Sequence, residues 1–183
     1  MNGAFQRAVR WNWVSLNPVQ LVEPPSRLPP DPDPPTVAEA VRLLDEAWLD
    51  PDWGTLVWFT MTTGLRRGEL CGVRWSQVDL ERGAVTINRA IARYDGVLVE
   101  KDTKSHQKRR LALDPQAIEI LKEHRARAVE RAASLGLTLR PDAFLFSLAP
   151  DNSTPMKPAT VGQRSSRMAA RVEIDTHLHC LRH

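Results

Sequence analysis

The sequence is poor in cysteine, lysine and tyrosine, and it has no long apolar run. Its two cysteines, Cys71 and Cys180, are too few for a disulfide framework, which favours a reducing compartment. No stretch is apolar enough to cross a membrane, and the first residues lack the charged and then apolar pattern of a secretory leader. We therefore expect a cytoplasmic protein whose 183 residues form one domain, or one domain and part of another.

The balance of charge is mildly basic. The net charge is +3 and the isoelectric point is about 9.2, which alone does not argue for a nucleic-acid partner. The ratio of arginine to lysine is more informative, because five of the 25 basic residues are lysine and the other 20 are arginine. The planar guanidinium suits bidentate contact with phosphate oxygens. A GC-rich genome that favours arginine codons explains the count equally well, so the positions of the arginines must decide.

Proline marks a boundary near the N-terminus. Eight of the 14 prolines lie between Pro18 and Pro35, and such a stretch forms a semi-rigid extended linker. Before it, the spacing of apolar residues predicts a short helix over about residues 4–14. We expect three parts: a short N-terminal piece at 1–22, a linker at 23–35 and a domain at 36–183.

The third part is predicted to be mainly helical with a small antiparallel sheet. Thr36 and Glu39 form a capping box, and Gly64 ends an almost wholly apolar helical segment. Helices are predicted at 36–48, 53–63, from about 65, at 115–135 and at 158–172, with a last one starting near 176. Strands are predicted at 84–87, 97–99 and 110–113. We therefore expect an α+β fold, mainly α with about three strands, rather than a doubly wound sheet.

Two arginines stand where a helix begins. Arg66 and Arg67 follow Gly64, and a helix N-terminus already carries partial positive charge. One local remedy is Glu69, which lies three residues after Arg66 on the same helix face. Another is an external anion, which helix N-termini bind readily. A surface Arg–Glu pair of little energetic value explains the pattern as well.

A second basic cluster lies at residues 101–110, in the loop between the last two predicted strands. A basic hairpin tip is often only a device that keeps a sheet edge soluble. A lysine there can also act as a general acid, because its proton is mobile whereas arginine stays protonated. The residues alone leave both interpretations open.

The last residues of the sequence are rich in histidine. His179 and Arg182 stand three apart, a spacing that places both on one face of a helix. Such a pair suits a phosphate site, because imidazole moves protons and guanidinium neutralises charge. The competing hypothesis is a zinc site, since the same stretch holds four potential ligands: His177, His179, Cys180 and His183.

Two segments resemble the two halves of one known active site. Residues 63–70 read Thr-Gly-Leu-Arg-Arg-Gly-Glu-Leu, and residues 178–183 read Leu-His-Cys-Leu-Arg-His. Both resemble motifs of the tyrosine recombinases, also called phage integrases, and residues 103–113 resemble the segment that carries the family's hairpin lysine. The resemblance implies four catalytic residues and one supporting residue: Arg66, Lys104, His179 and Arg182, with Glu69 in support. For the hairpin lysine, Lys101 is the alternative to Lys104.

The same resemblance implies a partner and a reaction. The protein would bind double-stranded DNA, self-associate on it, and carry out site-specific recombination or integration by cleaving and rejoining strands through a 3′-phosphotyrosine. Such chemistry needs no cofactor. The family motif accounts for His179 and Arg182 without a metal, so we expect neither cofactor nor metal.

The sequence also departs from the family. The family's nucleophilic tyrosine follows the His-x-x-Arg motif, whereas the one tyrosine here is Tyr94, which we expect to be a packing residue. Residues 1–22 resemble only the last helix of the family's core-binding domain. We therefore expect a fragment that is truncated at both ends and inactive alone. The alternatives are a non-catalytic DNA-binding remnant of a mobile element, and a metal-binding or structural helical domain unrelated to DNA.

Overall fold

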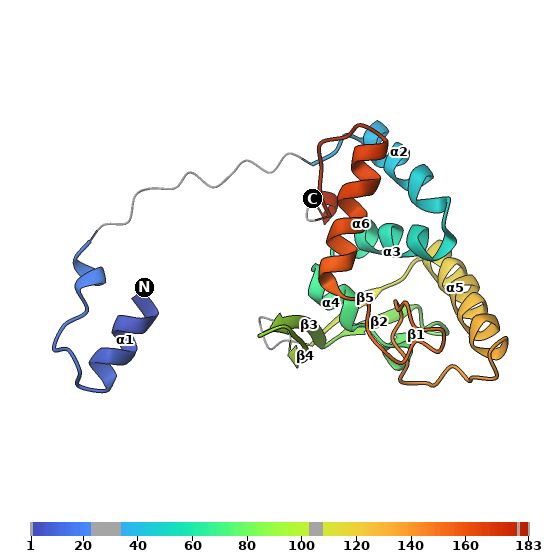
Figure 1. Cartoon of the computed structure of the whole chain (residues 1–183). Helices are drawn as coiled ribbons and strands as arrows, with labels where there is room; N and C mark the ends of the chain where they lie inside the picture. The colour runs from blue at the N-terminus through green and yellow to red at the C-terminus, as the bar shows by residue number, and fades with distance from the viewer. Residues whose placement is uncertain (1, 23–33, 103–107, 179, 183) are drawn as a thin grey trace. The chain divides into compact units, whose positions relative to one another are not determined.

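The computed structural model of the chain describes residues 2–22, 34–102, 108–178 and 180–182. The chain divides into two compact units, Met1–Asp31 and Pro32–His183 (Figure 1). No helix in the described ranges is both long and apolar enough to cross a membrane.

The first unit is a helix followed by a turn. Helix α1 spans Asn2–Arg10 and the 3-10 turn η1 spans Pro18–Leu21. The buried side chain of Asn17 joins them, since it accepts a hydrogen bond from the backbone of Val19 and donates one to the side chain of Asn2. The predicted helix over 4–14 is wrong at its C-terminal end, because Asn12 adopts φ +55° and Trp13 lies beyond the helix with 73% of its surface exposed.

The described residues of the second unit contain five α-helices: α2 (Val37–Trp48), α3 (Pro51–Thr63), α4 (Arg67–Gly72), α5 (Pro115–Ala133) and α6 (Pro158–Arg171). Local signals set several ends as predicted. The side chain of Thr36 caps α2 while Glu39 accepts from the backbone nitrogen of Thr36. Gly64 ends α3 in the left-handed conformation at φ +60°.

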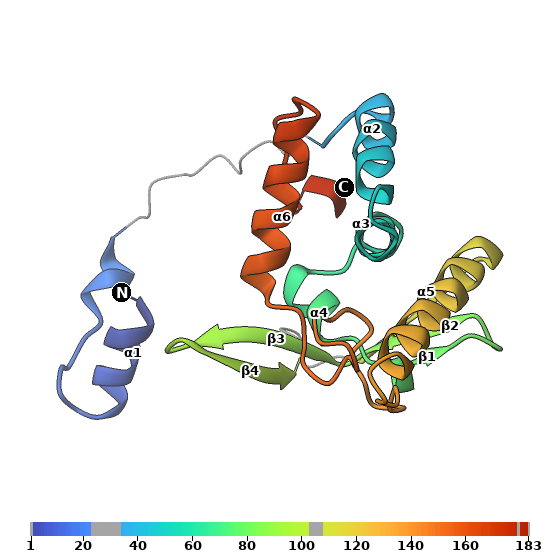
Figure 2. The ribbon, with the colours of Figure 1, turned by 45° about the vertical axis from the view of Figure 1, so that its right-hand side comes forward.

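Five short strands lie in the same described ranges: β1 (Val78–Asp79), β2 (Ala84–Ile87), β3 (Arg89–Tyr94), β4 (Val97–Asp102) and β5 (Arg109–Ala112). They form an antiparallel sheet in the order β1-β2-β5 and a separate hairpin, β3-β4. The hairpin extends beneath α4 in both ribbon views (Figures 1 and 2). The predicted fold class, mainly α with a small antiparallel sheet, is confirmed.

Several expectations about these elements are wrong. Strands β1 and β3 were not predicted, β4 continues through Lys101, which was expected in the loop, and β5 begins at Arg109, one residue before the predicted strand at 110–113. Tyr94 is not a packing residue, because it lies at the end of β3 with 72% of its surface exposed. No helix begins at residue 176 in the described part of the chain, because residues 174–177 have no regular secondary structure and the next described element is the 3-10 turn η3 (Cys180–Arg182).

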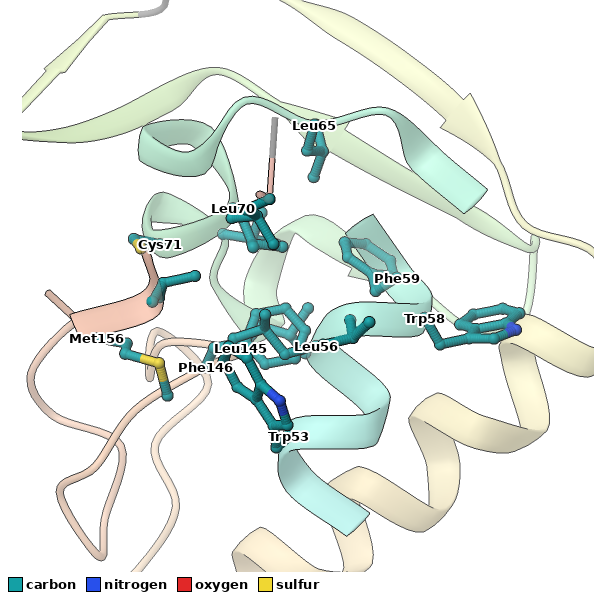
Figure 3. Packing of buried hydrophobic residues seen from close by; sticks show 14 of the residues in the cluster. Trp53, Leu56, Trp58, Phe59, Leu65, Leu70, Cys71, Leu145, Phe146 and Met156 are labelled. Carbon is teal, nitrogen blue, oxygen red and sulfur yellow. The ribbon is translucent and has the colours of Figure 1, made fainter. Parts of the chain in front are cut away.

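Helix α3 lies at the centre of the core (Figure 3). Eight consecutive residues of α3, from Trp53 to Thr60, are buried. The buried hydroxyls of Thr55 and Thr60 donate to backbone carbonyls four residues earlier in the same helix. The core around α3 therefore contains apolar side chains and hydroxyls that the helix itself satisfies.

A polar network ties the first turn of α3 to α5. The carboxylate of Asp52 lies 3.1 Å from Nδ1 of His124, 3.0 Å from Nε of Arg127 and 2.5 Å from Nη1 of Arg131. Burial by itself would raise the pKa of Asp52, but the hydrogen bonds and charges of His124, Arg127 and Arg131 outweigh it and hold that pKa far below its usual range. The imidazole of His124 is buried, and its Nε2 reaches the carbonyl oxygen of Leu145 at 2.8 Å.

Candidate active site

The first predicted site residues meet where α4 begins. Arg66 precedes the helix in an extended conformation, and Glu69 lies in its first turn. Glu69 accepts the backbone N–H of Arg66 through Oε2 at 2.9 Å and the Arg66 guanidinium through Oε1 at 3.2 Å. Glu69 is only 2% exposed, whereas the Arg66 side chain is 49% exposed. This buried acceptor separates the pair from the ordinary surface Arg–Glu pair considered above.

A third residue, which the sequence analysis did not assign to the site, completes this group. Nη2 of Arg109, in β5, lies 2.7 Å from Oε2 of Glu69. The buried carboxylate thus holds two guanidinium groups from segments 40 residues apart. No local pattern links Arg109 to Glu69, because their contact depends on how β5 docks beside α4. The available signal was an acidic residue with a single paired arginine, since an acid that becomes buried needs charged partners.

A groove lies beside this group, with a volume of about 1380 Å³. Its apolar lining includes Leu65, Ile91, Leu98 and Leu178. Its ionisable lining residues are all basic and come from α4, β3, α6 with its N-cap, and the segment before η3: Arg67, Arg93, Lys157, Arg167 and His177. The described residues that line the groove include no aspartate or glutamate. A groove of this kind attracts polyanions.

The guanidinium of Arg67 extends from α4 to α6. A methyl group built on Gly162 would lie 2.6 Å from Nη1 of Arg67, so the two helices meet through an arginine laid against a glycine. Arg66 and Arg67 are adjacent in the sequence, but their side chains have different neighbours. Arg66 pairs with Glu69, and Arg67 lines the groove.

The remaining predicted residues are only partly covered by the structure. Lys104 and His179 lie outside the described residues. Arg182 ends η3, and the buried side chains of Leu178 and Leu181 join this end of the chain to the core. The structure thus brings Arg66 and Glu69 together, and the assignments of Lys104, His179 and Arg182 stay predictions.

The two cysteines have different surroundings. Burial raises the pKa of the Cys71 thiol to about 12, so it stays protonated and unreactive near neutral pH. Sγ of Cys180 lies 3.3 Å from Nδ1 of His177. Within the described ranges, which leave out His179 and His183, no three potential metal ligands come together.

The comparison with known families decides which family this is. A sequence profile described as the phage integrase family matches residues 41–183. The chain belongs to this family. Phage integrases are tyrosine recombinases, a family of site-specific DNA recombinases, and the resemblance seen in the two motifs is thereby confirmed.

Part of the chain aligns with a curated relative. It is the putative defective protein IntQ of Escherichia coli (strain K12), which is 32% identical over 122 residues. The alignment takes in 67% of this chain and 30% of the relative. The chain therefore spans less than a third of that protein.

Solved structures of phage integrases and related recombinases share the fold. The Tn1549 transposon integrase in complex with transposon right end DNA matches 100% of this chain and 61% of its own, with a TM-score of 0.72 and 18% identity. XerA recombinase matches with a TM-score of 0.62 and 21% identity, covering 84% of this chain and 49% of its own. A lambda integrase tetramer bound to a Holliday junction matches with a TM-score of 0.64 and 18% identity, covering 99% of this chain and 47% of its own.

Proposed function

We propose that this integrase chain binds the phosphate backbone of double-stranded DNA with the guanidinium of Arg66, as part of a recombinase active site. The observation that supports this most is the buried carboxylate of Glu69, which holds Arg66 at the surface beside a basic groove. An arginine oriented in advance loses little freedom when it binds an anion. Relatives of the same fold have been solved with transposon DNA and with a Holliday junction.

The family's chemistry assigns the other roles. In strand cleavage, a tyrosine oxygen attacks the scissile phosphorus while the bond from phosphorus to the 5′ oxygen breaks. In our proposal Arg66 and Arg182 neutralise the non-bridging oxygens, His179 assists as acid or base, and Lys104 gives a proton to the leaving 5′ oxygen. The enzyme stores the bond energy as a 3′-phosphotyrosine, so neither a cofactor nor a metal enters the scheme.

The 183 residues contain one tyrosine, Tyr94, and it lies at the exposed end of the β3–β4 hairpin. We propose that Tyr94 is not the nucleophile, because it precedes rather than follows the His-x-x-Arg motif. This chain on its own would then bind DNA without cleaving it. Under the same proposal residues 36–183 are catalytic-domain sequence, 23–35 are a linker, and 1–22 are the last helix of a core-binding domain.

The second candidate function is DNA binding without any catalytic role, as the remnant of a mobile element. The observation in its favour is the likeness to a protein that is itself named as defective. Both candidates share the phosphate-binding site at Arg66, and both predict that this chain alone forms no covalent adduct, so an adduct would contradict both.

A nicked duplex that traps covalent intermediates tests the proposal. We expect retention of DNA with a dissociation constant of about 10⁻⁴–10⁻⁶ M that weakens steeply as salt rises, and no adduct that survives detergent. The matched variants are Arg66→Gln and Arg82→Gln, which remove the same charge, with Arg82 highly exposed and outside the groove. Binding that ignores salt, or that Arg66→Gln leaves unchanged, would refute the DNA-binding role, and an adduct at Tyr94 would refute the proposed inactivity.

A further inference from the structure

The carboxylate of Glu69 serves two arginines at once. Oε2 lies 2.9 Å from the backbone nitrogen of Arg66 and 2.7 Å from Nη2 of Arg109, while Oε1 lies 3.2 Å from Nη1 of Arg66. The carboxylate is buried, and the side chains of Arg66 and Arg109 are 49% and 38% exposed. A single buried negative charge therefore holds two positive charges near the surface.

Arg109 reaches Glu69 from a different part of the fold. Its backbone is fixed in the β2–β5 ladder, where Arg109 pairs with Ile87. Arg66 binds both oxygens of Glu69, but it lies only three residues away in the chain, and the last torsion of a glutamate is broad and soft. Arg109 adds a charged donor to Oε2 that is anchored separately, in the sheet, and so limits rotation about that torsion.

We propose that Arg109 is a positioning residue for Arg66 and acts through Glu69. The inference rests on the proposed function, in which Arg66 binds a DNA phosphate. Arg109 holds Oε2, which directs Oε1 toward Nη1 of Arg66, and the other N–H groups of the Arg66 guanidinium are left for the phosphate. Arg109 itself does not touch the phosphate. Its loss would therefore remove the Arg66 contact although Arg66 is still present.

The first test is a double-mutant cycle of DNA binding at several salt concentrations. Loss of one phosphate contact should lower the slope of log K against log salt by about 0.9. We expect Arg66→Gln and Arg109→Gln each to lower the slope by that amount and to weaken binding about tenfold. The double variant should bind no more weakly than Arg66→Gln alone, because both changes remove the same contact.

Arg110 supplies the matched control. It is the next residue of β5, its side chain is 59% exposed, and it lies 4.0 Å from Asp79 rather than near Glu69. Neighbouring strand residues point to opposite faces. Arg110→Gln therefore removes the same charge from the same strand, and its effect on binding should add to that of Arg66→Gln. Arg109→Lys should recover part of the affinity, because an ammonium can still donate one bond to Glu69.

Two results of this binding cycle would overturn the proposal. If the effects of Arg66→Gln and Arg109→Gln add, Arg109 makes a phosphate contact of its own. If Arg109→Gln binds as tightly as the unchanged protein, Glu69 orients Arg66 without help. In either case Arg109 is not a positioning residue.

The second test needs no DNA. Urea unfolding of Glu69→Gln, Arg109→Gln and the double variant measures whether the two side chains are coupled. We expect the midpoint shift of Arg109→Gln to largely disappear when Glu69 is already replaced. Additive shifts overturn the proposal whatever the DNA result. Clear coupling in a protein that fails to retain DNA overturns the proposed function instead, and leaves Arg109 as a structural partner of Glu69.

Discussion

Replacing Asp52 should destabilise the second unit more than its partly exposed position suggests. Asp52→Ala leaves one buried imidazole and two arginines without their shared carboxylate. Breaking a fully buried ion pair costs about 3–5 kcal/mol. We take the lower end, about 3 kcal/mol, because Arg127 and Arg131 are each about a third exposed and can turn to water.

Urea unfolding followed by circular dichroism measures this loss. With a slope of about 2 kcal/mol per molar urea, a loss of about 3 kcal/mol moves the midpoint down by about 1.5 M. The matched control is Asp142→Ala, which breaks an ion pair with Arg140 in which both side chains are well exposed and should change stability by less than about 1 kcal/mol. Equal midpoints for the two variants would refute the reasoning, because the network around Asp52 would then contribute no more than a surface pair.

Three further outcomes follow from the described residues. Stability should fall in acid, because the pKa of Asp52 is lower in the folded than in the unfolded protein. The stability that Asp52 contributes is complete above the unfolded-state pKa of about 3.9 and is lost as the pH drops below it. Asp52→Ala should therefore flatten that part of the profile of stability against pH. Gly68→Ala should cost about 1–3 kcal/mol, since its new methyl would lie 2.7 Å from the carbonyl oxygen of Ile91, whereas Gly3→Ala meets nothing within 4 Å and should leave unfolding of the second unit unchanged. A thiol reagent at pH 8 should label Cys180 well before Cys71, whose pKa is raised by burial; faster labelling of Cys71, seen by peptide mass spectrometry, would contradict its burial.

Helix ends were predictable where a nearby residue sets them. The cap at Thr36, the stop at Gly64 and the start of α5 at Pro115 each depend on side chains within a few positions. The end of α1 was misplaced because an apolar face continues in the sequence past Arg10, where the backbone turns away at Asn12.

Strand β3 was missed although a signal was present. Its sequence, Arg-Ala-Ile-Ala-Arg-Tyr, contains two alanines and alternates weakly, so strand propensity alone does not mark it. The turn after it does mark the strand, because an Asp-Gly pair favours the two-residue turn that joins hairpin strands. Asp95 and Gly96 form that turn, and both adopt positive φ. The exposure of Tyr94 follows from its place beside this turn.

The site was predictable in part for a similar reason. The Arg66–Glu69 contact spans three residues and could be inferred from spacing. The contact between Glu69 and Arg109 spans 40 residues and depends on the packing of β5 against α4, for which the sequence holds no local pattern. Family resemblance supplied Lys104, His179 and Arg182, which no distance in the described residues tests.

The threonines of α3 affect which substitutions the core around this helix can accept. Thr55, Thr60 and Thr62 give their hydroxyl protons to carbonyls of their own helix, so the helix supplies acceptors for these groups itself. Apart from the α5 side chains that bind Asp52 and Thr55, its neighbours in the core need chiefly apolar volume of the right size. Exchanges among leucine, isoleucine and methionine around α3, at positions such as Leu43 and Leu121, therefore require no matching polar change. Substitutions in this core can accumulate one at a time, which is one physical route by which proteins of this fold come to share less than a quarter of their residues.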